Sequence, residues 1–160
     1  RDAAGHFWFG DEFGPFFVET DATGRVLGRE VPLPGVFAPE NPYRGTQPSN
    51  LGSSRGFEGL AISAAGDRLF GLIEGTVDGD TPNTLRIHEF SIRQRAFTGR
   101  TFGYRLDPAG TNIGDMTAVT DTVFLALAIL IAGATLHRRP APRLRAGPGR
   151  ETTRNSAQAS

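Results

Sequence analysis

Short segments in which apolar and polar residues alternate run through most of the chain, separated by turns rich in glycine, proline and aspartate. A period of two is typical of β-strands, and helical periodicity is nearly absent before residue 123. Residues 32–56 contain five prolines and are expected to form a long loop. The predicted strands are residues 7–10, 15–20, 26–31, 60–63, 68–74, 85–92, 101–106, 115–120 and 123–128, with a turn at 93–99.

Two pairs of segments resemble each other along the chain. Residues 57–63 (FEGLAIS) resemble residues 114–120 (GDMTAVT), which aligns Glu58 with Asp115 and continues to Phe70 with Phe124. Residues 69–74 (LFGLIE) resemble residues 7–12 (FWFGDE), so that two strands end on an acidic residue. A repeat of this length with about four strands per copy predicts the blade of a β-propeller.

The predicted fold is therefore all-β, an incomplete β-propeller. Residues 57–106 would form one four-stranded blade, residues 7–31 the later part of the preceding blade, and residues 114–128 the start of the next. A propeller closes with about four to eight blades and this chain holds about two and a half, so we expect a fragment of a larger protein. Trp8 is expected in the core between blades.

Charge is distributed unevenly although the formal net charge is zero. Residues 1–123 contain 11 Arg and 16 acidic residues, whereas residues 124–160 contain 6 Arg and 1 acidic residue. The balance argues against a nucleic-acid partner. The absence of cysteine excludes disulfides and thiol catalysis, and no phosphate loop, dinucleotide fingerprint or Gly-x-Ser-x-Gly elbow is present, which argues against an organic cofactor.

Acidic residues recur at equivalent places in the predicted blades. Strand starts and strand ends of successive blades face one mouth of a propeller, so the repeat would place a ring of carboxylates there. Such a ring is suited to Ca²⁺, which takes about six to eight oxygen ligands, and the metal would bind phosphoryl oxygens as a Lewis acid. The candidate ligands are Asp11, Glu12, Glu58, Glu74 and Asp115, and the candidate catalytic residues are Glu58, Glu74 and Asp115. A purely structural role, with the acids bonded to backbone amides or arginines, remains open for all of them.

Other candidates are weaker. Arg55 precedes Gly56-Phe57-Glu58 and is the candidate substrate-binding residue for a phosphate, although pairing with an acid is an alternative. The loop at residues 78–80 (DGD) is a second oxygen-rich site. Three histidines are too scattered to nominate a metal cluster, and His88 is expected to face solvent, with a minor chance of acting as a general base.

Several of these residues lie in motifs of a known family. Residues 8–15 (WFGDEFGP) resemble the W-x-x-D-E-x-G-P start of the esterase-like phytase family, and residues 55–61 (RGFEGLA) with the acid-ended strand to Glu74 resemble its second signature. The resemblance covers about residues 5–125. It implies a secreted or periplasmic bacterial β-propeller that hydrolyses phosphate or other esters through clustered carboxylates, with calcium as a further analogy.

The resemblance ends after Phe124, where the family continues to another acid. Residues 125–131 (LALAILI) are apolar instead, and an Arg-, Pro- and Ala-rich tail follows. We therefore separate residues 1–125, the partial propeller, from residues 126–160, an apolar segment and a disordered basic tail that does not look native. A disrupted reading frame and a membrane anchor both explain the segment; residues 123–136 are shorter than the about 20 residues of a span, which favours the disruption.

Two functional classes remain open from the sequence. One is an extracytoplasmic ester or phosphoester hydrolase whose signal peptide is not within these residues and whose fragment would be inactive alone. The other is a non-catalytic propeller that binds a ligand or partner at its mouth. Substrate, metal and oligomeric state are not determined by the sequence.

Overall fold

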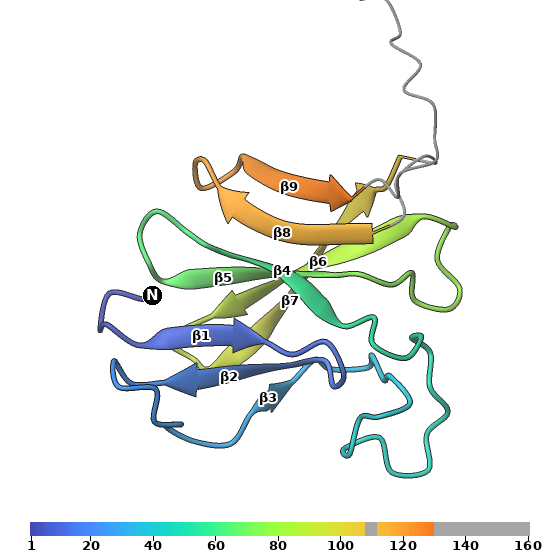
Figure 1. The fold of residues 1–160 in the computed structure, drawn as a ribbon, viewed down its shortest axis with the longest axis horizontal. Helices are drawn as coiled ribbons and strands as arrows, with labels where there is room; N and C mark the ends of the chain where they lie inside the picture. The colour runs from blue at the N-terminus through green and yellow to red at the C-terminus, as the bar shows by residue number, and fades with distance from the viewer. Residues whose placement is uncertain (108–111, 130–160) are drawn as a thin grey trace, which may run out of the picture.

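The computed structural model describes residues 1–107 and 112–129, and in these residues the chain is all-β without any helix. Three antiparallel sheets stack side by side as successive blades of an incomplete propeller (Figure 1). Of the apolar segment and basic tail predicted at residues 126–160, residues 130–160 lie outside the described residues. Sheet A contains β1 (Phe7–Gly10), β2 (Phe16–Thr20) and β3 (Val31–Pro32); sheet B contains β4 (Phe57–Ile62), β5 (Arg68–Ile73), β6 (Thr84–Ser91) and β7 (Ala96–Arg105); sheet C contains β8 (Asn112–Ala118) and β9 (Phe124–Ile129).

Sheet B confirms the predicted four-stranded blade, with strand order β4-β5-β6-β7. The prediction was wrong at the start of β7, because a turn was expected through residue 99. The chain reverses earlier, at Arg95, whose φ is 49° and whose amide donates to the Ile92 carbonyl. Ala96 is therefore already paired with Ser91, and β7 is longer than its sequence pattern indicates.

Sheet A departs from the prediction at its third strand. A strand was expected at residues 26–31, but only Val31 and Pro32 pair with β2, and Val26 makes an isolated bridge to Thr20. Val26 and Leu27 are exposed, so no buried apolar row holds this segment along the sheet. The long loop that follows is confirmed, and it contributes buried apolar side chains to the core: Leu33, Val36, Ala38 and Leu51.

Two apolar cores lie between the sheets. The A/B core joins sheets A and B and contains Trp8, Phe17, Phe57, Phe90 and the side chains of β5 that face sheet A. The B/C core joins sheets B and C through Ala61, Phe70, Leu72, Ile113 and Met116. Trp8 is thus confirmed as an inter-blade core residue, and the alternating sides of β5 serve the two cores in turn.

The structural repeat differs from the predicted one by one residue. A bulge falls between Phe57 and Gly59 in β4, and the matching bulge falls between Ile113 and Asp115 in β8. Side chains at like positions then face the same way, because Leu60 and Met116 both point back toward the preceding sheet. Glu58 therefore corresponds to Gly114, and Asp115 takes the place of Gly59.

The predicted alignment of Glu58 with Asp115, and of Phe70 with Phe124, was consequently wrong. By strand pairing Phe124 corresponds to Leu69, since Ala118 pairs with Phe124 as Ile62 pairs with Leu69. A slip of one residue moves every side chain of a strand to the opposite face of the sheet. The match between residues 7–12 and 69–74 needs no such correction, because Trp8 and Phe70 both face the following sheet.

Candidate functional site

Backbone hydrogen bonds bring three segments together at one end of the sheets. The amide of Gly56 donates to the carbonyl of Glu12 at 2.8 Å, and the amide of Phe57 donates to the carbonyl of Asp11 at 3.1 Å. On the other side, the amide of Glu74 donates to the carbonyl of Gly56 at 2.8 Å. The ends of β1 and β5 and the start of β4 are thereby tied into one mouth.

Glycine is required at the centre of this junction. A Cβ on Gly56 would lie 2.6 Å from the carbonyl oxygen of Glu12 and 2.9 Å from that of Asp11. Both neighbours are backbone atoms, which cannot rotate away as a flexible side chain does. The close approach of these segments therefore depends on the absence of a side chain at residue 56.

Three glutamates at the mouth affect the pKa values of one another. Burial raises the pKa of Glu58, and the negative charges of Glu74 and Glu12 raise it further. Burial also raises the pKa of Glu74; the positive charge of Arg55 opposes that change and the charge of Glu12 adds to it. Glu12, Glu58 and Glu74, three of the predicted site residues, thus lie close enough to influence one another.

Arg55 connects the mouth to sheet C. Its Nη1 lies 3.5 Å from Oε1 of Glu74, which forms an ion pair, and donates to Oδ1 of Asn112 at 3.1 Å. A cavity of about 290 Å³ opens beside this pair, with Thr76, Asn83 and other residues in its wall. Arg55 and Glu74 therefore border a space large enough for a small polar group, and Arg55 is also paired with an acid, as the alternative interpretation expected.

The remaining predicted acids have other environments. Oδ1 of Asp11 accepts hydrogen bonds from the amides of Phe13 and Gly14 at 3.0 and 2.5 Å. Asp11 therefore stabilises the turn in which it lies. Asp115 is exposed, accepts the amide of Met116, and stands opposite Leu127 on the face of sheet C that points away from sheet B. The one-residue shift of the repeat explains why Asp115 does not point where Glu58 points.

The predicted calcium ligands do not converge as a cage. Ligands about 2.4 Å from one calcium ion lie within about 4.8 Å of each other. Among the described residues, no three of the five predicted carboxylates offer atoms that close. In the second candidate loop, both oxygens of Asp80 accept from Arg86 at 2.7 and 2.8 Å, and this guanidinium lowers the pKa of Asp80.

His88 was expected to face solvent, and this prediction was wrong. Its side chain is buried on β6, edge-on to Phe97, and Thr101 is its hydrogen-bond partner through Nδ1. Burial, with a smaller contribution from the charge of Arg86, lowers its pKa to about 4. His88 is therefore neutral near pH 7, and it belongs to the packing between sheets A and B.

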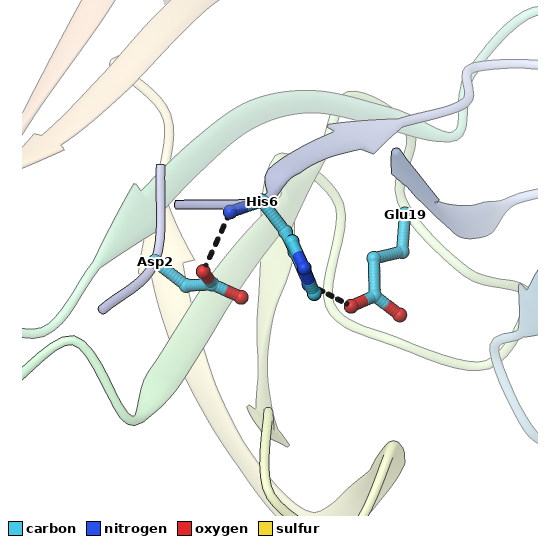
Figure 2. A group of neighbouring side chains, drawn as sticks. All are labelled: Asp2, His6 and Glu19. Atoms are coloured by element: carbon cyan, nitrogen blue, oxygen red, sulfur yellow. Dashed lines mark hydrogen bonds and ion pairs between the residues drawn. The ribbon is translucent and has the colours of Figure 1, made fainter. Parts of the chain in front are cut away.

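A second group of ionisable residues, Asp2, His6 and Glu19, was missed because the histidines are scattered along the sequence (Figure 2). His6 Nδ1 lies 2.8 Å from Oε1 of Glu19, and the His6 amide donates to Oδ1 of Asp2 at 2.9 Å. The outer oxygens are also bonded, that of Asp2 to Trp8 Nε1 and that of Glu19 to Arg95. Pairing of β1 with β2 creates this group, and the spacing of the residues along the chain gives no sign of it.

The protein's own donors satisfy the Asp2–His6–Glu19 group. Burial raises the pKa of Asp2, but the hydrogen bonds from Trp8 and His6 outweigh it, so that the pKa lies below its ordinary value. The guanidinium of Arg95 shares Glu19 and stacks over Trp8 with 5.7 Å between its central carbon and the ring centroid. We interpret the group as a structural lock between sheet A and the β6–β7 turn.

Comparison with known proteins identifies the family. A family model described as "Phytase-like: Esterase-like activity of phytase" matches residues 1–128. This chain belongs to the phytase-like family. The match includes all three sheets of the phytase-like chain apart from the last residue of β9, and it confirms the resemblance seen in the two sequence signatures.

An uncharacterized secreted protein of Arthroderma benhamiae (strain ATCC MYA-4681 / CBS 112371) is 32% identical over 95 residues. The alignment covers 48% of the phytase-like chain and 18% of that protein. The chain thus spans less than a fifth of the length of this relative. No solved structure matches the chain. Among the described residues, no helix is long and apolar enough to cross a membrane.

Proposed function

We propose that the phytase-like chain forms part of the mouth of an extracellular hydrolase that acts on phosphate or other esters. One observation carries the proposal: Glu12, Glu58 and Glu74 are held at one mouth by backbone bonds, and the pKa values of Glu58 and Glu74 are raised by burial and by their acidic neighbours. Perturbed carboxylates beside a cavity and an arginine are typical of acid–base sites. The family description supports the ester substrate.

The environments of the two glutamates suggest different roles. Arg55 favours the ionised form of Glu74, which can then take a proton from an attacking water. Burial and the two acidic neighbours Glu74 and Glu12 raise the pKa of Glu58, so its protonated form is favoured and can donate to the departing oxygen. Arg55 would bind the phosphoryl or carbonyl oxygen, where its planar donors stabilise developing negative charge.

Bound calcium is a further proposal, which the negative charge of the carboxylates supports and their geometry does not. A bound Ca²⁺ would supply Lewis-acid polarisation of an ester oxygen and would offset the repulsion among the glutamates. The described carboxylates do not converge as a calcium cage requires, so no step above depends on the ion. Asp115 as a catalytic residue would require the outer face of sheet C to take part.

Secretion is part of the proposal. The printed description of the Arthroderma relative is a secreted protein, and the phytase-like chain contains no cysteine that would depend on the redox state of its compartment. A non-catalytic binding module is the second candidate, favoured by the ion pair that already engages Arg55. In that case the cavity beside Arg55 would hold a ligand without turnover.

Ester and phosphoester hydrolysis by a longer phytase-like protein that includes these residues tests the proposal. p-Nitrophenyl phosphate and p-nitrophenyl acetate are the substrates, each with added calcium and with chelator. We expect Glu58→Gln and Glu74→Gln to lower kcat at least about 100-fold, in the range of acid–base contributions, while the exposed control Asp115→Asn keeps it. The 160-residue chain by itself is expected to show no turnover.

Unchanged turnover in both glutamine variants would remove the hydrolytic mechanism. Binding without turnover, with phosphate affinity lost in Arg55→Ala but kept in Glu58→Gln, would support the binding module instead. Because Arg55 and Glu74 form an ion pair, circular dichroism must show that each variant retains the all-β fold before kinetics are compared.

A further inference from the structure

The backbone and the aliphatic stem of Arg55 are tightly packed beside the mouth. The carbonyl of Arg55 accepts a hydrogen bond from the amide of Gly75 at 2.9 Å. The stem lies against two glycines: a Cβ on Gly75 would come within 2.7 Å of the Arg55 Cβ, and a Cβ on Gly52 would come within 3.2 Å of the Arg55 Cγ. Close packing therefore sets the course of the stem, and the guanidinium is the part of Arg55 that can change its partner.

The guanidinium has two acceptors near one nitrogen. Nη1 of Arg55 donates to Oδ1 of Asn112 at 3.1 Å, whereas Oε1 of Glu74 lies 3.5 Å from the same nitrogen. The first distance is typical of a hydrogen bond from N–H to oxygen, and the second is longer than such bonds usually are. Arg55 is thus hydrogen-bonded to Asn112 and paired with Glu74 by charge.

Another arginine of sheet B shows the alternative arrangement. Nε and Nη2 of Arg86 donate to the two oxygens of Asp80 at 2.7 and 2.8 Å, so one edge of this guanidinium is fully engaged by a carboxylate. Such an arginine must give up both bonds before the same edge can bind a substrate oxyanion. Asn112 carries no charge, so it holds the guanidinium of Arg55 without neutralising it.

The contact between sheets B and C brings Asn112 to Arg55. Asn112 is the first residue of β8, and the next residue, Ile113, is buried in the B/C core. β8 also lies closely against β4, because a Cβ on Gly59 would come within 2.8 Å of the Cβ of Met116. Packing of sheet C on sheet B therefore places Asn112, and sheet C supplies one polar side chain to the mouth.

We propose that Asn112 is a positioning residue of the mouth, which keeps the guanidinium of Arg55 available to the adjoining cavity and out of direct hydrogen bonding with Glu74. The proposal rests on the proposed function, in which Arg55 binds an ester or phosphate oxygen. Without the amide oxygen of Asn112, the acceptor that remains near Nη1 is Oε1 of Glu74. A direct bond to Glu74 would engage the donors and the charge that an anionic substrate needs. Asn112 thus affects binding through Arg55, without contacting the substrate.

Affinity for inorganic phosphate and the KM for p-nitrophenyl phosphate test the proposal in a longer phytase-like protein that includes these residues. We expect Asn112→Ala to weaken phosphate binding and to raise KM about 3- to 10-fold, the effect of about one hydrogen bond. A loss of folded protein would lower kcat and leave KM unchanged, so KM separates positioning from structural support. Thr117→Ala, at an exposed position of the same strand, is the matched control and should leave both values unchanged.

A double-mutant cycle shows whether Asn112 acts through Arg55. In an Arg55→Ala background, Asn112→Ala should change phosphate affinity by less than about twofold, because no guanidinium remains to be positioned. In a Glu74→Gln background its effect should also shrink, because a neutral amide attracts the guanidinium less than a carboxylate does. Asn112→Ser, whose hydroxyl is one bond shorter than the amide oxygen, is a second variant with the same expected results as Asn112→Ala.

The outcomes distinguish this inference from the proposed function. Unchanged phosphate affinity and KM in both Asn112 variants, while Arg55→Ala weakens binding, would overturn the positioning role alone. Equal effects of Asn112→Ala with and without Arg55 would also overturn it, because the amide would then act by another route. Unchanged phosphate affinity in Arg55→Ala would overturn the proposed role of Arg55 and the positioning role together.

Discussion

The A/B interface and the B/C interface join equivalent sheets, yet they are filled differently. At A/B, the ring of Phe17 lies 4.5, 5.2 and 5.1 Å from those of Phe57, Phe90 and Phe97. At B/C, the described residues provide one ring pair, Phe70 with Phe124 at 4.7 Å. A cavity of about 310 Å³ remains beside this pair.

The paired glutamates show the same difference. Glu19 stands opposite Trp8 in sheet A, as Glu89 stands opposite Phe70 in sheet B. Glu19 is bonded by Arg95 from the neighbouring sheet, whereas Glu89 is paired at 3.1 Å with Arg100 of its own sheet. A residue of sheet B thus pairs with the buried glutamate of sheet A. The described part of sheet C has only two strands, and the glutamate of sheet B is paired within its own sheet.

The largest expected effect is loss of the A/B aromatic core. Phe17→Ala should lower the free energy of unfolding by about 3–5 kcal/mol, because Phe17 is fully buried among three rings. Phe124→Ala, at the half-buried B/C pair, should cost less than half as much. Urea denaturation followed by circular dichroism measures both, and equal losses would contradict the comparison.

Acid should weaken the A/B interface through His88. Its folded pKa of about 4 lies below the ordinary 6.5, so the unfolded chain binds a proton that the folded chain does not. Stability is thus lost as pH falls from about 6.5 to 4, by on the order of 2–3 kcal/mol. Carboxylates titrate as well, so the readout is the difference between the unmodified chain and His88→Leu in urea denaturation at pH 7 and pH 4.5. If the unmodified chain and His88→Leu lose the same free energy of unfolding between pH 7 and pH 4.5, His88 is excluded as the cause.

Removal of the inter-sheet guanidinium should have a smaller effect. Arg95→Ala leaves the buried carboxylate of Glu19 without its cation and should cost about 1–2 kcal/mol, since Arg95 is itself partly exposed. Arg93→Ala, which removes the same charge from an exposed position of the same turn, is the control and should be within about 0.5 kcal/mol of the unmodified chain. Equal melting temperatures for the two variants would contradict the role of Arg95 in the structural lock.

The smallest effect is expected at the mouth, where both interfaces end. The raised pKa of Glu58 means that its ionised form destabilises the folded chain, so Glu58→Gln should stabilise the chain at pH 7. The gain should be under about 1 kcal/mol, because solvent screens the site, and should disappear as pH falls below the ordinary pKa. Asp115→Asn is the exposed control. Destabilisation by Glu58→Gln at pH 7 would show that the carboxylate makes a favourable contact instead.

Alternation of apolar residues was enough to predict most strands, the four-stranded sheet B and the core position of Trp8, because each depends on local pattern and short turns. The positions of Glu12 and Glu74 at the mouth could be predicted, because both residues come at the ends of equivalent strands. Asp115 was misaligned because matching Ala61 with Ala118 set the repeat one residue out, and a slip of one residue reverses the face of a strand. The His6–Glu19 pair required the register of β1 and β2, and the burial of His88 required knowledge of what sheet A covers.

The glycine at position 56 has a consequence for engineering. Hydrogen bonds between peptide groups hold the backbone of this junction together, so it should keep its course whichever functional groups are attached nearby. The carboxylates there could be replaced by amides or imidazoles without a change in the backbone. The single methyl group of an alanine at residue 56 would instead force the strand ends apart.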